Sequence, residues 1–517
     1  MTFEIVFVLL SLLGMMAALI ADKMRPGMVL FSVVVLFLCV GILTPKEMLE
    51  GFSNKGMITV ALLFLVSEGI RQSGTLGQVI KKLLPQGKTT VFKAQLRILP
   101  SVAFISAFLN NTPVVVIFAP IIKHWAKSVK LPATKFLIPL SYVTILGGIC
   151  TLIGTSTNLV VHGMILEAGY EGFTMFELGK VGIFIAIAGI IYLFIFSKRL
   201  LPDARPDTAV PDEEVEEGEK LHRVEAVLGA RFPGINKKLS DFNFQRHYGA
   251  EVKEIKTRNG QRYVDHLEDV VLREGDTLVV MADDTFIPTW GESSVFVLLT
   301  NGNDPDTSGK KKRWLALILL VLMIVGATVG ELPATKEMFP DIKLDMFFFV
   351  CITTIIMAWT NIFPARKYTK YISWDILITI ACAFAISKAM VNSGVADCVA
   401  GFIIGLSDDY GPHVLLAILF LITNLFTELI TNNAAAALAF PLALSISAQL
   451  GVSPTPFFVV ICMAASASFS TPIGYQTNLI VQGIGNYKFT DFVRIGLPLN
   501  IITFLISVIL IPLIWNF

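Results

Sequence analysis

Residues 151–163 read TLIGTSTNLVVHG, and residues 471–483 read TPIGYQTNLIVQG. Each segment starts with threonine, has glycine three residues later, and has asparagine four residues after that glycine. Both lie inside long apolar stretches, where such residues interrupt a helix. A break at membrane depth is tolerated only where the backbone is buried in protein or lines a polar cavity. The pair therefore predicts a membrane protein with an unwound segment in each half.

The same offset of about 320 residues relates other parts of the chain. Residues 68–74 (EGIRQSG) align with residues 388–394 (KAMVNSG), and residues 110–112 (NNT) align with residues 431–433 (TNN). Internal duplication is typical of secondary transporters. We therefore expect two repeats that contribute equivalent elements to one transport site.

Composition restricts the class of protein. Of the 517 residues, 54% are hydrophobic and 16% are charged, which is too apolar for an ordinary soluble enzyme. No P-loop, metal-spaced cluster or nucleophile elbow occurs, so neither an enzyme nor an ATP-driven pump is indicated. The net charge of +1 gives no sign of a nucleic-acid partner.

The expected fold is an all-α polytopic membrane protein with two inverted repeats. Each repeat has about five crossings plus one re-entrant hairpin, and this odd number places the second repeat upside down relative to the first. A small α+β cytosolic domain is inserted between them. The expected divisions are repeat 1 (1–200, hairpin about 96–127), a linker (201–220), the inserted domain (221–300), a second linker (301–312) and repeat 2 (313–517, hairpin about 412–449).

The inserted domain is indicated by an abrupt change in composition after Leu201. An acidic, proline-containing linker is followed by alternating segments and turn signals such as Asn259-Gly260. The segments that read as strands are Val224–Leu228, Glu251–Lys256, Thr277–Met281 and Val295–Leu299.

Basic residues gather in the loops that this arrangement places in the cytosol, as the positive-inside rule requires. We therefore expect a multi-pass protein of a bacterial-type inner membrane, surrounded by lipid, with the insert cytosolic and both termini outside. The basic residues include Arg71, Lys81, Lys82, Lys88, Lys93 and Arg97, and then Lys123, Lys127, Lys130 and Lys135.

Polar residues interrupt both expected hairpins at the middle. We expect Thr112 to cap a helix that begins at Pro113, and Asn433 to cap one that begins at Ala434. Asn158 and Asn478 are expected to cap the half-helices that follow the two unwound segments. The N-terminus of a helix favours an anion, whereas unwound carbonyls and side-chain oxygens suit a hard cation such as Na⁺.

The paired hairpins and the Gly-x-x-x-Asn breaks resemble the divalent anion/sodium symporter family over nearly the whole chain outside residues 201–312. Each tip in that family carries Ser-Asn-Thr, and the breaks often carry Gly-x-Pro-Pro-Asn. Here Ser156-Thr157 and Gln476-Thr477 replace the prolines. The resemblance implies Na⁺ as the coupling ion, a homodimer and an elevator-type alternating-access mechanism.

Residues 229–281 resemble the C-terminal regulatory (TrkA-C) domain of potassium-uptake and potassium-channel proteins. Members of the symporter group with such inserts are associated with inorganic sulfate uptake. The resemblance therefore implies sulfate ahead of a dicarboxylate, and a small ligand for the insert. A dimer-stabilising or inert appendage is the alternative role of the insert.

We expect the tips and breaks to form one pocket for a small anion and for Na⁺. The candidate Na⁺ ligands are Ser106, Asn110, Asn111 and Gly154 and, in the second half, Thr427, Thr431, Asn432 and Gly474. The candidate substrate-binding residues are Asn110, Asn111, Thr112, Thr155, Ser156, Asn432, Asn433, Tyr475 and Gln476.

Two alternative functions stay open. A Na⁺/H⁺ antiporter or arsenite-type permease on the same fold would show proton flux that depends on Glu428 or Glu68. A channel gated by the cytosolic domain would pass ions without saturation or stoichiometric coupling.

Overall fold

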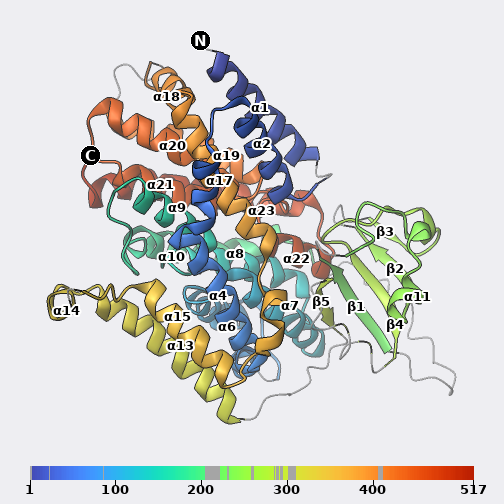
Figure 1. Ribbon diagram of the computed structural model, residues 1–517. Coiled ribbons are helices and arrows are strands. Elements are labelled where there is room, and N and C mark those ends of the chain that lie inside the picture. Colours follow the sequence, from blue (N-terminus) through green and yellow to red (C-terminus); the bar gives the residue numbers. More distant parts are fainter. Residues whose placement is uncertain are drawn as a thin grey trace, which may run out of the picture.

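The computed structural model consists mainly of helices that form one body, with a small sheet at one side (Figure 1). Among the residues that the structure describes, eight helical segments are long and apolar enough to cross a membrane. The chain is therefore a polytopic membrane protein, as predicted. The structure describes residues 3–21, 24–85, 87–203, 222–229, 232–257, 261–283, 286, 290, 295–300, 310–339, 341–405 and 411–517.

Residues 3–200 form helices joined by short turns, and the turns η1 (Gly51–Ser53) and η2 (Ala133–Lys135) precede α4 and α8. The helices are α1 (Phe3–Ala21), α2 (Pro26–Val40), α3 (Pro45–Glu50), α4 (Lys55–Gln72), α5 (Thr75–Leu83), α6 (Val91–Ser106), α7 (Asn111–Ser128), α8 (Leu137–Gly148), α9 (Ser156–Glu167) and α10 (Gly179–Leu200).

Residues 310–517 repeat much of this order of long and short helices, with one further turn, η5 (Ala365–Lys367). The helices are α13 (Lys310–Gly330), α14 (Pro333–Met338), α15 (Met346–Trp359), α16 (Tyr368–Tyr371), α17 (Trp374–Asn392), α18 (Val395–Gly405), α19 (Gly411–Leu429), α20 (Asn432–Leu450), α21 (Thr455–Ser466), α22 (Gln476–Gly485) and α23 (Phe489–Ile514).

Local residues set several helix boundaries. Pro26 occupies the first turn of α2, and Gly41 ends this helix in the left-handed region at φ 82°. The side chain of Thr44 accepts the backbone N–H of Glu47, whose carboxylate accepts the backbone N–H of Thr44, so a capping box starts α3.

Helices of the two halves pack against one another throughout the body. The packed pairs are α2 with α17, α4 with α15, α7 with α22, α9 with α20, and α10 with α23. Some approaches require glycine: a Cβ at Gly51 would collide with the carbonyl of Ala381 in α17. The halves therefore form one packed body, because each of these pairs joins a helix from residues 3–200 to one from residues 310–517.

Residues 222–300 contain a five-stranded antiparallel sheet in the order β3-β2-β4-β1-β5. Aromatic side chains, among them Phe232, Phe242, Tyr248 and Phe296, pack into its core. Its elements are β1 (His222–Leu228), η3 (Leu239–Asp241), α11 (Phe244–Tyr248), β2 (Glu251–Lys256), β3 (Arg262–Tyr263), η4 (Leu267–Asp269), β4 (Thr277–Ala282) and β5 (Phe296–Thr300).

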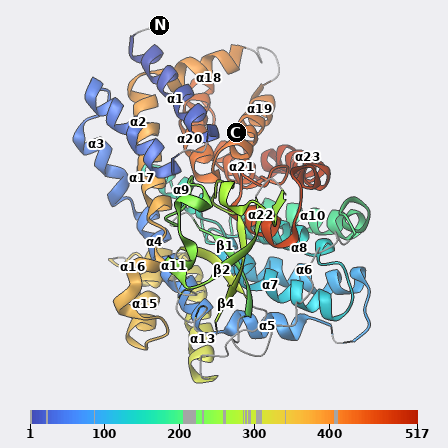
Figure 2. The same ribbon diagram turned by 90° about the vertical axis from the view of Figure 1, so that its right-hand side faces the viewer.

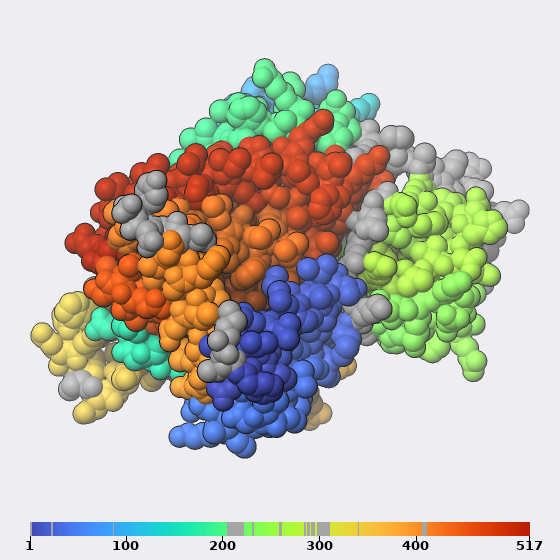
Figure 3. Space-filling view, turned by 90° about the horizontal axis from the view of Figure 1, so that it is seen from above, coloured from blue at the N-terminus to red at the C-terminus, as the bar shows by residue number. Residues whose placement is uncertain are grey.

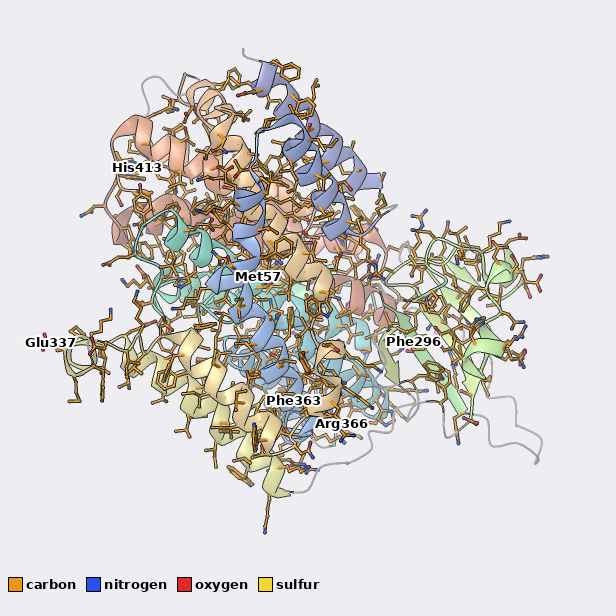
Figure 4. The ribbon with its side chains drawn as sticks, in the orientation of Figure 1. Met57, Phe296, Glu337, Phe363, Arg366 and His413 are labelled. Atoms are coloured by element: carbon orange, nitrogen blue, oxygen red, sulfur yellow. The ribbon has the colours of Figure 1, made fainter. Side chains whose placement is uncertain are left out.

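Strands occur at all four positions expected from the sequence, whereas β3 was not expected. The expected turn at Asn259-Gly260 lies outside the described residues. Figure 2 shows the sheet in front of the helical body, and in Figure 3 it forms a lobe at one side. Phe296 lies on the side of this lobe nearer to the helices, and Glu337 of α14 lies at the far end of the molecule (Figure 4).

A charged contact joins the sheet to the helical body. Glu225 of β1 accepts hydrogen bonds from Lys123 of α7, at 3.0 and 3.1 Å, and from Lys256 of β2, at 3.3 Å. Burial by itself would raise the pKa of Glu225, but the two lysines outweigh burial and lower this pKa from 4.5 to about 2. A Cβ at Gly275, before β4, would lie 3.7 Å from Leu479 of α22. The sheet therefore rests on α7 and α22.

Candidate ion-binding site

The first hairpin tip lies between α6, which ends at Ser106, and α7, which begins at Asn111. The second lies between α19, which ends at Leu429, and α20, which begins at Asn432. The expected helix starts at Pro113 and Ala434 were therefore wrong by two residues. Thr112 and Asn433 do not cap these helices, because they already lie in the first turn, where their side chains reach the other half of the chain.

The unwound segments lie between α8 and α9 and between α21 and α22. Asn158 donates its Nδ2 hydrogens to the carbonyls of Thr151, at 2.9 Å, and Gly148, at 3.5 Å. Asn478 donates to the carbonyls of Ser468, at 2.9 Å, and Thr471, at 3.1 Å. The expected capping role of both asparagines was therefore wrong. They instead bind carbonyls that have lost their helical partners, which lowers the cost of burying those groups.

Each unwound segment is also tied to the hairpin of its own half. The Thr151 hydroxyl donates to the Ala107 carbonyl and accepts the Gly154 N–H at 3.1 Å. In the second half, the Thr471 hydroxyl donates to the Glu428 carbonyl at 3.1 Å and accepts the Gly474 N–H at 3.3 Å. The same pair of hydrogen bonds thus recurs in the second half, about 320 residues later in the chain.

Further hydrogen bonds cross from one half to the other. Asn111 donates its Nδ2 hydrogen to the Tyr475 hydroxyl at 2.8 Å, and this hydroxyl shares a second bond of 2.9 Å with Thr155 Oγ1. The Oδ1 atom of Asn111 accepts from Ser106 Oγ at 2.7 Å. All four residues are buried. The first tip and the first unwound segment therefore meet at one hydroxyl of the second half.

A second set of crossing bonds lies beside the first. Thr112 Oγ1 donates to Gln476 Oε1 at 3.2 Å. Asn433 Oδ1 accepts from Ser156 Oγ at 3.3 Å and from Thr157 Oγ1 at 3.2 Å. Each hairpin tip therefore contacts the first turn of the helix that follows the unwound segment of the opposite half.

The remaining predicted residues lie around this centre in different orientations. Asn432 lies next to the Tyr475 hydroxyl. Asn110 lines a small, mostly apolar pocket together with Ser156. Thr431 Oγ1 is buried without a hydrogen-bond partner in the described structure. Thr427 donates its hydroxyl hydrogen to the Ala465 carbonyl at 2.6 Å, and the lone pairs of this hydroxyl and the carbonyl oxygen of Thr427 remain available to a ligand.

Sequence reasoning missed two groups next to the second tip, Ser468 and Asn500. Asn500 of α23 donates to Glu428 Oε1 at 2.7 Å and to Ser470 Oγ at 2.8 Å. A lone asparagine in an otherwise apolar span is a signal that could have found Asn500. Glu68, in contrast, accepts from Arg71 and Gln72 of its own helix.

Comparison with known proteins assigns the chain to a family of transporters. A family model described as a citrate transporter (CitMHS) matches residues 16–446 and residues 338–517. The chain belongs to the citrate transporter family. It is 30% identical to an uncharacterized transporter of Synechocystis over 94% of this chain and 93% of that protein. The family and this relative are both described as transporters, so this chain is a transporter.

Two further relatives match parts of this chain. Sodium/sulfate cotransporter 2 of Chlamydomonas reinhardtii is 30% identical over 54% of this chain and 31% of that protein. The sodium-dependent dicarboxylate transporter of Staphylococcus saprophyticus is 25% identical over 28% of this chain and 28% of that protein.

Proposed function

We propose that the protein is a Na⁺-coupled symporter of a small divalent anion, with sulfate favoured over a dicarboxylate. The observation that carries this proposal is the meeting of Asn111 and Thr155, from the first half, at the Tyr475 hydroxyl of the second half. A relative named as a sodium/sulfate cotransporter supports the choice of Na⁺ and sulfate. Another relative, named as a sodium-dependent dicarboxylate transporter, supports a dicarboxylate as the second substrate class.

We infer that residues 1–200 and 313–517 are two inverted repeats. The hydrogen bonds of Thr151 and Asn158 recur at Thr471 and Asn478, which supports a duplicated unit. An odd number of crossings in each repeat brings the two hairpins into the membrane from opposite sides, so that their tips meet at mid-bilayer.

Four helices begin at this meeting point, and this favours an anion. The first residues of α7, α9, α20 and α22 are Asn111, Ser156, Asn432 and Gln476. The free N–H groups and positive dipole end of each helix attract negative charge. An anion held by Asn111, Thr112, Thr155, Ser156, Asn432, Asn433, Tyr475 and Gln476 would lie between these four ends.

The side chains around each tip fit Na⁺, which prefers oxygen ligands. One site would use Ser106, Asn110, Asn111 and Gly154, and the other would use Thr427, Thr431, Asn432 and Gly474. The unpartnered, buried Thr431 Oγ1 supports this assignment, because such a group gains a ligand when a cation binds. Bound Na⁺ would neutralise the anion and order both tips, which couples the two fluxes without covalent chemistry.

The wider arrangement follows from the same proposal. The protein is a homodimer in the inner membrane, and the transport site crosses the bilayer by an elevator-type motion. Residues 221–300 form a cytosolic regulatory domain that binds a small ligand. Contact of this domain with α7 and α22 supports a regulatory role, because both helices begin at the transport site.

Uptake of labelled anions into proteoliposomes tests the proposal. Sulfate uptake should rise with an inward Na⁺ gradient and should be lost in Asn111→Ala and Asn432→Ala. Asn392→Ala is the control, because Asn392 donates to the Ile42 carbonyl and to Glu47, outside the site. Thiosulfate, succinate, citrate and arsenite complete the panel. Uptake that ignores Na⁺, or full activity of both site variants, would contradict the proposal.

A further inference from the structure

The second half differs from the first at two aligned positions of the site. Glu428 stands where the first half has Ala107, because Thr471 bonds the Glu428 carbonyl as Thr151 bonds that of Ala107. Ser468 stands where the first half has Gly148, since Asn478 and Asn158 bond these two carbonyls. Only the second half thus adds a carboxylate and a hydroxyl to its tip.

The two oxygens of the Glu428 carboxylate differ in their hydrogen bonds. Oε1 accepts the Ser470 backbone N–H at 2.9 Å and the Asn500 Nδ2 hydrogen at 2.7 Å. Oε2 lies 3.4 Å from Ser468 Oγ, and the side chain and backbone of Thr471 also interact with this carboxylate. Within the described ranges no lysine, arginine or histidine forms an ion pair with Glu428. Because a buried charge without a counter-ion is costly, a bound cation would stabilise the ionised form of this carboxylate.

Ser468 Oγ is fully buried, yet it makes no hydrogen bond of normal length. It lies 3.4 Å from Glu428 Oε2 and 3.5 Å from the Thr427 carbonyl oxygen, whereas O–H···O bonds are about 2.7–2.8 Å long. Oxygen ligands lie about 2.3–2.6 Å from Ca²⁺, and Na⁺ has nearly the same radius. Two such ligands at a right angle are about 3.3–3.7 Å apart. Both distances therefore match neighbouring ligands of one Na⁺ ion.

Only glycine fits beside these two oxygens. A Cβ at Gly474 would collide with both Ser468 Oγ and the Thr427 carbonyl oxygen. The Oδ1 atom of Asn500, a residue with 7% exposure, has no hydrogen-bond partner in the described structure, and its Nδ2 is bonded to Glu428. The cluster thus combines a carboxylate, two further oxygens and an unpartnered amide oxygen.

We infer that Glu428 and Ser468 are ligands of the Na⁺ ion in the second half, where they form a charged cation site with the Thr427 carbonyl. This inference rests on the proposed Na⁺ coupling. The first-half site has no carboxylate, so the two sites are unequal. The second site binds Na⁺ more tightly, because the ion and the carboxylate neutralise each other.

Half-saturating Na⁺ for anion uptake, measured at neutral pH, tests the inference. In Glu428→Gln this concentration should be about tenfold or more higher than in the wild type, because one charge-assisted ligand is lost. Glu428→Asp, which keeps the charge, should restore part of the affinity for Na⁺. Glu68→Gln is the control, since Glu68 is bonded within its own helix.

Thermal melting of the purified protein against NaCl or choline chloride gives a second readout that does not require transport. Wild type should be stabilised by Na⁺, and Ser468→Gly, which restores the first-half residue, should need several times more Na⁺ for the same shift. Unchanged half-saturating Na⁺ in both Glu428→Gln and Ser468→Gly would overturn the inference alone. A wild type without any response to Na⁺ would overturn the proposed function as well.

Discussion

Replacing Tyr475 by phenylalanine removes the hydroxyl at which the two halves meet and leaves the ring in place. Asn111 Nδ2 and Thr155 Oγ1 then lose a partner at 2.8 and 2.9 Å in a buried site. A buried polar group without a partner costs about 1–3 kcal/mol. At about 1.4 kcal/mol for each factor of ten, one such group weakens apparent anion affinity by roughly 5- to 150-fold.

The assay is half-saturating sulfate at saturating Na⁺ in proteoliposomes. Tyr192→Phe is the matched control, because Tyr192 and Tyr475 are both 7% exposed and the Tyr192 hydroxyl donates only to the Ile495 carbonyl, at 3.0 Å. This control should keep its affinity for sulfate. Wild-type affinity in Tyr475→Phe, or an equal loss in both variants, would refute the reasoning.

Two further predictions concern stability. Gly154→Ala should lower the melting temperature, because its Cβ would lie 2.7 Å from the Cα of Gly148 and overpacking typically costs about 1–3 kcal/mol. Gly14→Ala, with nothing within 4 Å of the new Cβ, should leave it unchanged or slightly raised. Since the folded pKa of Glu225 is lowered from 4.5 to about 2, its stabilisation is complete above pH 4.5 and is lost as the pH falls toward 2. Glu225→Gln should lower the melting temperature at neutral pH and weaken this acid dependence.

Much of the fold follows from apolar length and from helix breakers. The long helices were expected because about 20 apolar residues are needed to span lipid, and the breaks were expected because Gly154 and Gly474 interrupt such stretches. The short helices α5 and α18 were not expected, since a helix of about ten residues is too short for a span. Helices α7 and α20 begin two residues earlier than the expected starts at Pro113 and Ala434, so that Thr112 and Asn433 lie in the first turn.

That the candidate residues lie close together was predictable where one half repeats the other. Asn111 and Tyr475 lie in the aligned tips and breaks, and the structure joins them by a hydrogen bond. Ser468 and Asn500 could not, because a single serine or asparagine in an apolar helix is as often a packing residue. Their proximity to Glu428 depends on how α19, α21 and α23 pack, which no local pattern encodes.

The bond between Asn111 and Tyr475 joins residues 364 positions apart in the chain. At roughly 5–20 residues per second, a ribosome reaches Tyr475 about 20–70 seconds after it has made Asn111. During that interval the first tip has polar groups without their final partners in a newly inserted half. The bond that joins the two halves therefore forms only after the helices near the end of the chain have been made.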